Sequence, residues 1–348
     1  MRVLVMMSGG VDSSVAAALL RDAGHEVVGV TLKLWGGESD SGCCSVSDVD
    51  DARRAADALG LVHHVFDLGD EFTRHVVAPY AADHEAGRTP NPCIECNRHL
   101  KFAAVDDRAR ALGFDAIATG HHARIVARSD GTRRLARGAD RAKDQSYVLH
   151  VLDQERLART LLPVGDLTKA EVRQVAAELG LRTATKPDSQ DVCFITRTQG
   201  RASFLGDRVE LTPGTVVDRS GEELGHVAAV ELVTVGQRRG LGLPGGTAPR
   251  YVVDVDVAAR RVVVGDRADL LVDAQEVEHL RWSAGVADSP LDVQCSAHGA
   301  PQPASIELLG GGRAWVRWSV PQRRVAPGQS VVAYVGDEVV AGAIAAPG

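Results

Sequence analysis

Residues 2–24, RVLVMMSGGVDSSVAAALLRDAG, contain the pattern that decides the fold of the N-terminal half. The apolar run 2–7 predicts a buried strand, because a half-exposed strand would alternate apolar and polar residues. A glycine turn follows at once, and the helical pattern after it stops at Gly24, a residue type that often follows a helix end. The stretch therefore predicts a strand, a turn and a helix in direct succession.

Further runs of the same kind extend this pattern. Apolar stretches at 26–34, 61–68 and 115–120 predict more buried strands. Between and after them, helices are predicted from a Ser47 cap to Gly60 and from a capping box of Thr168 with Glu171. Strands alternating with helices imply parallel pairing with right-handed crossovers, hence a doubly wound α/β domain. Ligands of such sheets bind outside the carboxyl ends of the strands.

After about residue 205 the pattern changes to short alternating runs separated by glycine and aspartate turns, which is typical of strands and hairpins. We predict three domains: an α/β domain at 1–204, a small β domain at 205–268 and a barrel-like β domain at 269–348.

Composition limits the functional classes. The chain has 348 residues, 45% of them hydrophobic, and its formal net charge of -7 argues against a protein that coats nucleic acid indiscriminately. The N-terminus fits neither a signal peptide nor a membrane-spanning helix, so we expect a soluble cytoplasmic protein with no membrane partner. Six cysteines are too few for a disulfide scaffold in a chain of this length and favour catalysis or metal binding.

The loop SGGVDSSV, residues 8–15, has the features of a phosphate site. Backbone N–H groups at a helix N-terminus attract anions, Gly9 and Gly10 permit close approach, and the Ser8, Ser13 and Ser14 hydroxyls can donate to phosphate oxygens. Asp12 is a poor neighbour for a bare phosphate, which suggests a helix cap or a bound magnesium ion. The loop lacks the lysine of GxxxxGK[ST]. It resembles instead the pyrophosphatase loop, SGGxDS, of enzymes that split ATP between the α and β phosphates.

Five further stretches decide among such enzymes. They are TPNPCIECNRHLKF (89–102), TGHHAR (119–124), KDQSYVL (143–149), KPDSQDVCFI (186–195) and VGQRRGLGLP (235–244). Together with the loop, they resemble the tRNA-specific 2-thiouridylase family, whose members place sulfur on the wobble uridine of tRNA.

The resemblance implies the fold, ligands and site residues. It implies an adenine nucleotide alpha hydrolase-like sheet, ATP and Mg²⁺ as ligands, the tRNA anticodon arm as partner, and a persulfide donor protein or sulfide as the sulfur source. ATP would be bound by Ser8, Gly9, Gly10, Val11, Asp12, Ser13, Ser14, Val15, Leu34 and Gly120. Cys96 matches the nucleophile and Cys193 the cysteine that carries a persulfide. Residues near the tRNA would be Asn91, Pro92, Cys93, His121, Lys143, Asp144, Gln145 and Gln329. The family's RY pair in the last domain is replaced here by VQCSAHG (293–299).

The chemistry calls for two thiols independently of the family. Adenylation turns the uracil C2 oxygen into a leaving group, a thiolate or persulfide then attacks C2, and a second thiol releases the sulfur or closes a disulfide. Cys96 is expected just before a helix that starts at Asn97, whose positive end would favour the thiolate.

Cys93 occupies a position where many relatives carry an acid/base aspartate, a role that Glu95 or Asp191 would then have to fill. The three thiols Cys93, Cys96 and Cys193 leave two mechanisms open. One is a persulfide relay between Cys96 and Cys193, and the other is a [4Fe-4S] cluster on all three.

Other interpretations compete with these. A zinc site on Cys43, Cys44, Cys93 and Cys96 has poor ligand spacing. In the histidine pair at 63–64, one side chain should face the protein and one the solvent, and of the pair at 121–122 only His121 has motif support. Most arginines of 128–143 and 235–240 are expected to be surface residues, with a local basic face left for tRNA. The competing functions are an adenylating ligase for a small molecule and a non-catalytic metal- or RNA-binding module.

Overall fold

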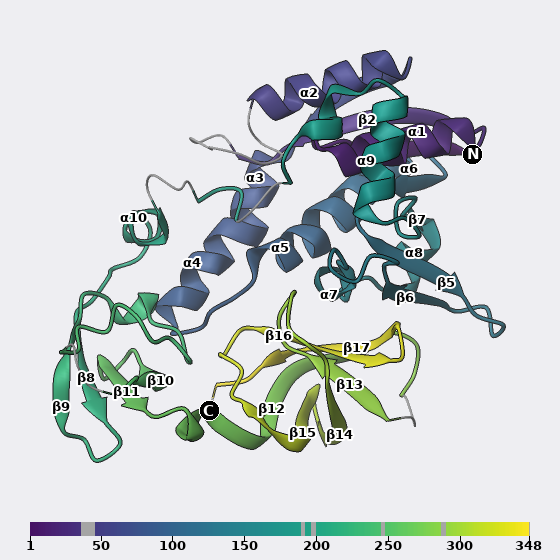
Figure 1. Ribbon diagram of the computed structural model, residues 1–348. Coiled ribbons are helices and arrows are strands. Elements are labelled where there is room, and N and C mark those ends of the chain that lie inside the picture. The colour runs from purple at the N-terminus through teal and green to yellow at the C-terminus, as the bar shows by residue number, and fades with distance from the viewer. Residues whose placement is uncertain (36–45, 189–191, 196–199, 245–247, 287–289, 348) are drawn as a thin grey trace.

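The computed structural model describes residues 1–35, 46–188, 192–195, 200–244, 248–286 and 290–347. Figure 1 shows an α/β unit built from the N-terminal half, with two groups of strands on one side of it. The predicted fold class is confirmed: a parallel sheet with helices is followed by β structure that ends in a barrel.

The first sheet is parallel, with strand order β3-β2-β1-β4-β7. Its strands are β1 (Arg2–Met6), β2 (Glu26–Lys33), β3 (Val62–Asp67), β4 (Ala116–Ala118) and β7 (Thr160–Leu161). The chain runs from β1 outward to β3 and then returns to the other side of β1 with β4. The loop after β1 therefore lies where the strand order reverses, which is where ligands bind in such sheets.

Helices cover both faces of this sheet. One face packs through a hydrophobic cluster onto α1 (Val11–Asp22), α2 (Val46–Ala58) and α9 (Lys169–Glu178). The other face carries two long helices, each with a π-helical middle part. The first consists of α3 (Gly69–Phe72), the π-helix η1 (Thr73–Val77) and α4 (Ala78–Glu85). The second consists of α5 (Pro92–Glu95), the π-helix η2 (Cys96–Ala104) and α6 (Val105–Ala111). We call residues 92–111 the cysteine helix. The further helices up to residue 206 of the described chain are α7 (Ser146–Leu149), α8 (Gln154–Arg159), the 3-10 helix η3 (Arg182–Thr185) and α10 (Gly200–Gly206).

The helix ends test the predicted caps. The capping box of α9 is confirmed, since the Glu171 N–H donates to Thr168 Oγ1 at 3.3 Å and the Thr168 N–H to Glu171 Oε2 at 2.7 Å. The Ser47 cap is wrong, because α2 already begins at Val46 and carries Asp48 in its first turn. The histidine pair on β3 is as predicted: His63 Nε2 lies 2.9 Å from Thr31 Oγ1, and His64 is exposed.

The two β units have separate cores. The first β unit is a sheet with strand order β10-β11-β8-β9. Its strands are β8 (Gly214–Asp218), β9 (Glu223–Val227), β10 (Tyr251–Asp256) and β11 (Arg261–Gly265), and the 3-10 helices η4 (Val230–Leu232) and η5 (Ala268–Leu270) lie beside them in sequence. The barrel consists of β12 (Leu271–Trp282), β15 (Arg313–Arg323), β14 (Gln302–Gly310), β13 (Leu291–Gln294), β16 (Ser330–Val335) and β17 (Glu338–Ala345), closed by the pairing of β12 with β17.

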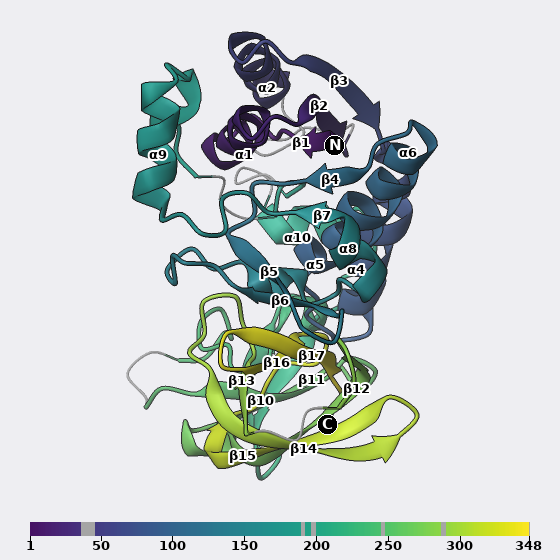
Figure 2. The same ribbon diagram turned by 90° about the vertical axis from the view of Figure 1, so that its right-hand side faces the viewer.

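One connection between units was not predicted. The hairpin of β5 (Ala123–Ala127) and β6 (Arg133–Arg137) leaves the α/β unit and pairs through β6 with β17 of the barrel. Figures 1 and 2 both show this hairpin lying along the barrel. The basic stretch 128–143 therefore helps to fix the barrel to the α/β unit.

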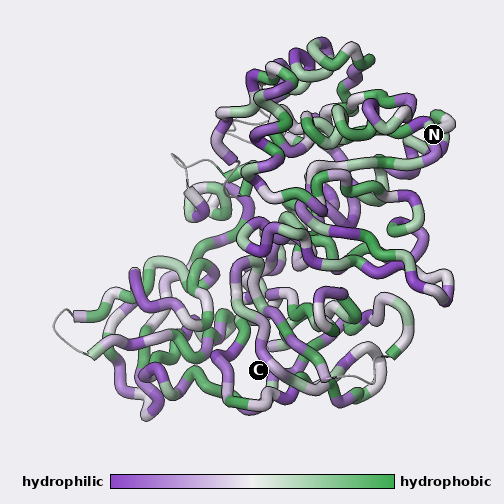
Figure 3. The backbone as a smooth tube through the Cα atoms, turned by 45° about the vertical axis from the view of Figure 1, so that its right-hand side comes forward, coloured by the Kyte–Doolittle hydropathy of each residue, from purple (hydrophilic) through white to green (hydrophobic). Residues whose placement is uncertain are grey.

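Hydrophobic and hydrophilic stretches are intermixed along the chain (Figure 3). Among the described residues, no helix is long and apolar enough to cross a membrane.

Candidate active site

The loop after β1, residues 8–15, forms the start of α1. Gly10 is the N-cap of α1, a helix of 12 residues, and no side chain of the cap residue accepts from the first N–H groups of this helix. Gly9 has a φ of 72° and packs against the Asp48 carbonyl oxygen so closely that a Cβ would overlap it. These are the features of an anion site at a helix N-terminus. We call residues 8–15 the phosphate loop.

The serine hydroxyls of the phosphate loop have internal partners. Ser13 Oγ and Ser14 Oγ donate to the Gly10 carbonyl oxygen at 3.1 and 3.0 Å, and the Ser8 N–H donates to Ser13 Oγ at 3.1 Å. In this structure Ser13 and Ser14 therefore hold the shape of the loop, where we had expected them to donate to phosphate oxygens. The anion donors that remain are mainly backbone N–H groups.

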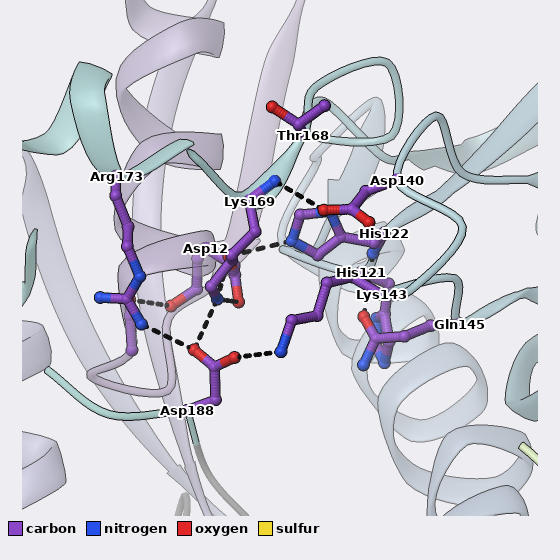
Figure 4. Close-up of polar contacts among 12 residues, drawn as sticks. Asp12, His121, His122, Asp140, Lys143, Gln145, Thr168, Lys169, Arg173 and Asp188 are labelled. Carbon is purple, nitrogen blue, oxygen red and sulfur yellow. Dashed lines mark hydrogen bonds and ion pairs between the residues drawn. The ribbon is translucent and has the colours of Figure 1, made fainter. Parts of the chain in front are cut away.

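Asp12 is bound by two side chains from other elements (Figure 4). Lys169 Nζ lies 2.8 and 2.7 Å from its two carboxylate oxygens, and His122 Nε2 lies 3.1 Å from Oδ1. Burial alone would raise the pKa of Asp12, but hydrogen bonds from His122 and Lys169 outweigh it and lower the pKa below its usual value. The helix-cap interpretation of Asp12 is wrong, because Gly10 is the N-cap.

Asp188 is the second carboxylate beside the loop and accepts from three cations. Lys143 Nζ lies 2.8 Å away, Lys169 Nζ 2.8 Å and an Arg173 guanidinium nitrogen 2.9 Å. Burial opposes the charge, yet the hydrogen bonds from Lys143 and Lys169 lower the pKa of Asp188 to about 2. Lys169 therefore bridges Asp12 and Asp188, as Figure 4 shows.

Lys186 approaches the same loop from the other side. Its Nζ donates to the Gly9 carbonyl oxygen at 3.0 Å, to Asp48 at 2.6 Å and to Asp51 at 2.6 Å. Sequence reasoning missed Lys169, Lys186 and Asp188. The only signal was their place in the LTK and KPDS stretches, beside motifs that had been assigned other roles.

The stretch 119–122 packs against the phosphate loop. A Cβ on Gly120 would lie 2.5 Å from Ser13 N and 2.6 Å from Asp12 C, so only glycine fits there. His121 Nδ1 lies 2.7 Å from Thr119 Oγ1, and burial lowers the pKa of His121 well below its usual value. Leu34, the other residue expected beside the nucleotide, is fully buried in the core. His122, for which no role was predicted, is the residue that contacts Asp12.

The cysteine helix begins earlier than predicted. Its N-cap is Asn91, whose side-chain oxygen accepts from the Cys93 N–H at 3.1 Å, and Pro92 is its first residue. Cys93 is exposed in the first turn, whereas Cys96 is buried at the start of η2. The prediction of a helix N-terminus at Cys96 is therefore wrong, because the proline starts the helix one turn earlier. The positive helix end lies nearer to Cys93.

Cys193 packs against the hydrophobic cluster that contains Cys96, and it is followed by the buried Phe194. Within the described ranges, no group of three or more His, Cys, Asp and Glu side chains is placed to hold a metal ion. The three thiols thus do not form a cluster site in this arrangement. Cys43 and Cys44 of the zinc interpretation, and Asp191, lie outside the described residues. Glu95, the other acid/base candidate, contacts Arg98 and His99 at 3.3 and 3.2 Å.

A hydrogen-bonded path joins the phosphate loop to the cysteine helix. From the Asp12 carboxylate it leads to the ring of His122, and the backbone N–H of His122 donates to Gln145 Oε1 at 2.9 Å. Gln145 caps α7, and within α7 the Val148 carbonyl oxygen accepts from Asn97 Nδ2 at 2.9 Å. Asn97 neighbours Cys96 in sequence, so hydrogen bonds and backbone together connect the loop to the helix that carries the thiol.

The other residues expected near tRNA have varied surroundings. Asp144 is almost buried and accepts from Arg137, the Gly138 N–H and Ser146. Gln329 Nε2 donates to the Thr89 carbonyl oxygen, which ties the barrel to the chain just before the cysteine helix. Basic residues of the β5–β6 region pair with Asp337 and Glu338 of the barrel; they are Arg124, Arg128 and Arg141. The expectation that most of these arginines are solvated surface residues is wrong for Arg128, Arg137 and Arg141, because they pair with carboxylates of the barrel or with Asp144.

Fold and site together define a nucleotide-dependent enzyme of the α/β class, with a glycine-rich loop at a helix N-terminus and with cysteines on a second helix. Three family descriptions match the chain in order: a tRNA methyl transferase HUP domain (1–197), a tRNA methyl transferase PRC-barrel domain (202–266) and an aminomethyltransferase beta-barrel domain (272–345). The chain belongs to the tRNA-specific 2-thiouridylase family. It is 49% identical to the tRNA-specific 2-thiouridylase MnmA of Acidothermus cellulolyticus, covering 99% of this chain and 97% of the relative. It is 44% identical to that of Geobacter metallireducens, covering 98% and 95%.

Among solved structures, the chain is similar to the U34-tRNA thiolase NcsA from Methanococcus maripaludis with its [4Fe-4S] cluster. That likeness has a TM-score of 0.38 and 16% identity, and it covers 60% of this chain and 63% of the other.

Proposed function

We propose that this protein is a tRNA-uridine 2-sulfurtransferase, which uses ATP to replace the C2 oxygen of the wobble uridine by sulfur. The observation that carries the proposal is the path from Asp12 through His122 and Gln145 to the helix of Cys96. It joins a phosphate site to a buried thiol, as an enzyme that adenylates and then thiolates one atom requires. The matching family descriptions name methyl transfer, but paired cysteines beside a phosphate loop suit sulfur transfer, as the relatives' names state.

In the first step, the uridine C2 oxygen attacks the α phosphorus of ATP, the bond to the β phosphate breaks, and pyrophosphate leaves. The phosphate loop binds the leaving pyrophosphate through the backbone N–H groups at the start of α1. Lys169 and Lys186, which lie at the loop, add positive charge as the pyrophosphate departs. The packing of Gly120 against Ser13 keeps the loop in this shape.

Magnesium fits this site through Asp12. Mg²⁺ usually takes one or two carboxylates and completes its shell with phosphate oxygens and water. A bound Mg²⁺ would neutralise charge on the phosphates. Asp12 can offer its carboxylate when Lys169 turns to a phosphate, and His122 holds that carboxylate in place meanwhile.

In the second step, the terminal sulfur of a persulfide on Cys193 attacks C2, and AMP leaves with the original oxygen. The Cys96 thiolate then attacks the Cys193 sulfur and breaks the S–S bond, which leaves sulfur on the uridine and a Cys96–Cys193 disulfide. An external thiol reductant returns both cysteines to thiols. Both cysteines pack against one hydrophobic cluster, which supports this pairing. A [4Fe-4S] cluster would need Cys93, Cys96 and Cys193 to converge, so no step is assigned to it.

We infer that tRNA approaches over the cysteine helix and the 143–145 stretch, with His121, Gln145 and Gln329 near the bound arm. Lys143 is 44% exposed and can turn toward RNA. Lys143→Ala should weaken tRNA binding in a filter assay and spare ATP binding. Lys33, which pairs with Asp67 at the far edge strand, provides the matched lysine control. Equal tRNA affinity of both variants would refute the role of Lys143.

Three further features belong to the proposal. The sulfur comes from a persulfide donor protein, which passes its terminal sulfur to Cys193, or from sulfide. Sulfide would attack Cys193 of the Cys96–Cys193 disulfide, which forms the persulfide on Cys193 and releases Cys96 as a thiolate. The enzyme works in the cytoplasm. The chain divides into an ATP-binding domain at 1–204 and two β domains at 205–268 and 269–348, which hold the tRNA. We base the domain division on the separate hydrophobic clusters of the two β units.

The test is anaerobic purification, followed by iron-free and iron-reconstituted samples given ATP, magnesium, unmodified tRNA and a sulfur source. Mass spectrometry of the digested tRNA counts 2-thiouridine. We expect the iron-free protein to work with a persulfide donor, and a Cys96→Ser, Cys193→Ser double variant to make none. If only the iron-loaded sample makes 2-thiouridine, a mechanism with an iron–sulfur cluster replaces the persulfide relay. If the double variant releases pyrophosphate at the full rate with a small molecule as acceptor, and tRNA receives no sulfur, the result would favour a ligase.

A further inference from the structure

The loop at 234–240 of the small β unit carries two adjacent arginines that no step above uses. It follows η4 and precedes β10, and Arg238 and Arg239 on it are both exposed. Within the described parts of the chain, neither of them forms an ion pair with a carboxylate, whereas Arg128 and Arg141 of the β5–β6 region both do. We call residues 234–240 the arginine loop.

Hydrogen bonds hold the arginine loop in one shape. Gln237 Oε1 accepts from the Thr234 N–H at 3.1 Å, and Gln237 Nε2 donates to the Arg239 carbonyl oxygen at 2.8 Å. The loop also pairs with β10, since the Gly236 N–H donates to the Val252 carbonyl oxygen at 2.7 Å and the Val252 N–H to that of Gln237 at 2.9 Å. The two guanidinium groups are therefore attached to a backbone that is ordered before a ligand binds, which reduces the entropy lost on binding.

The arginine loop is connected to the cysteine helix and to the barrel. Thr89, just before the cysteine helix, donates from its Oγ1 to Thr234 Oγ1 at 3.2 Å, and its carbonyl oxygen accepts from Gln329 of the barrel. On β15 of the barrel, the exposed Arg323 places a guanidinium nitrogen 3.5 Å from the Gly236 carbonyl oxygen. Figure 1 shows the small β unit beside both α4 and the barrel. A third exposed cation thus lies at a loop that is fixed to the segment carrying the reacting thiol.

The chemistry of this surface fits the phosphates of RNA. A guanidinium group is always charged and binds phosphate through two parallel hydrogen bonds. The chain as a whole has a net charge of -7, so it attracts RNA only where cations gather locally. Contacts from arginine to phosphate position a nucleic acid but do not read its sequence.

We propose that the arginine loop, together with Arg323, binds backbone phosphates of tRNA outside the reacting nucleotide. This inference rests on the proposed function, and it adds a contact surface on the small β unit to the positions expected near tRNA on the other two units. Arg238 and Arg239 hold the RNA while the wobble uridine lies near Cys96. They therefore increase the affinity for tRNA and take no part in the chemistry.

The test measures tRNA binding by an Arg238→Ala, Arg239→Ala double variant in a filter assay over a range of salt concentrations. Each lost phosphate contact lowers the slope of log affinity against log salt concentration by about 1, so the slope should fall by about 2. At one moderate salt concentration we expect Kd to rise about tenfold, and equally for a tRNA without a wobble uridine, because the contact is to phosphate. KM for tRNA should rise with Kd, whereas ATP binding and kcat at saturating tRNA should not change. Arg238→Lys, Arg239→Lys keeps both charges and should restore most of the slope.

Arg260 and Arg261 provide the matched control, since they are also adjacent and exposed on the same β unit, where β10 turns into β11. Arg260→Ala, Arg261→Ala should bind tRNA as wild type does. The inference is overturned if this control loses as much affinity as the loop variant, or if the loop variant binds tRNA as tightly as wild type. A wild-type protein that binds tRNA but makes no 2-thiouridine would instead overturn the proposed function.

Discussion

Replacing Gly120 by alanine tests whether the 119–122 stretch holds the phosphate loop in its active shape. The new Cβ would lie 2.5 Å from Ser13 N and 2.6 Å from Asp12 C. Ordinary contacts of a Cβ begin at 3.4 Å, so the two backbones must separate by about 0.9 Å. Both neighbours are main-chain atoms, so no flexible side chain can move aside. The backbone of Gly120 itself does not resist, because its φ lies outside the left-handed region.

A shift of this size acts directly on the donors of the phosphate loop. A misplacement of 1 Å in a catalytic arrangement can cost about a hundredfold in rate, or about 2.7 kcal/mol of transition-state stabilisation. We expect kcat/KM for ATP to fall about a hundredfold in a pyrophosphate-release assay with saturating tRNA. The free energy of unfolding should fall by about 1–3 kcal/mol, as is usual for overpacking.

The matched control for this variant is Gly206→Ala. Its Cβ would approach nothing closer than Leu211 Cδ1 at 3.4 Å, and it lies at the end of α10, away from the loop. The control should keep wild-type activity. A Gly120→Ala protein that uses ATP as well as the control would show that the close packing of 120 on the loop does not set its catalytic shape.

Further predictions concern the unit boundaries and the third thiol. Gly342 lies on β17, and a Cβ at this position would overlap His150 Nδ1. Gly342→Ala should therefore lower the melting temperature by several degrees in a thermal scan. Burial lowers the pKa of His84 to about 4. Because this folded-state pKa lies below the unfolded one of about 6.5, the unfolded state binds more protons as the pH falls, and stability is lost from pH 6.5 down to about 4. Urea titrations should show that wild type loses about 2 kcal/mol more than His84→Gln between pH 7 and pH 5, and parallel losses would refute the assignment. Cys93→Ser should keep 2-thiouridine formation within about twofold of wild type, because an unneeded exposed thiol contributes little transition-state stabilisation, and a loss as large as that of Cys96→Ser would give Cys93 a role in the chemistry.

The fold was largely predictable because its signals are local. The buried strands β1, β2 and β4, the glycine after α1 and the capping box of α9 each depend on a few neighbouring residues. The strand β3 was predicted to be buried as well, and that was wrong, because β3 is an edge strand with no buried residue. The prediction of where the cysteine helix begins was wrong, and the reason is also local. Pro92 is suited to a first helical position and starts the helix one turn before the predicted start at Asn97.

The pairing of β6 with β17 could not be read from the sequence. The two strands are separated by about 200 residues, and the basic composition of 128–143 suggested solvent or RNA as the partner. What decides the outcome is the position of Asp337 and Glu338 opposite the arginines, which only the tertiary fold reveals. A charge-rich stretch predicts that partners exist, but it does not identify them.

The same limit explains which site residues were found and which were missed. The phosphate loop was found because its function lies in its own backbone, which consecutive residues encode. Asp12 was noticed, but its partners were not, since Lys169 and His122 reach it from segments more than 100 residues away. Each charge at this site is balanced by one on another element, so a change at any of them alters the preferred position of the others.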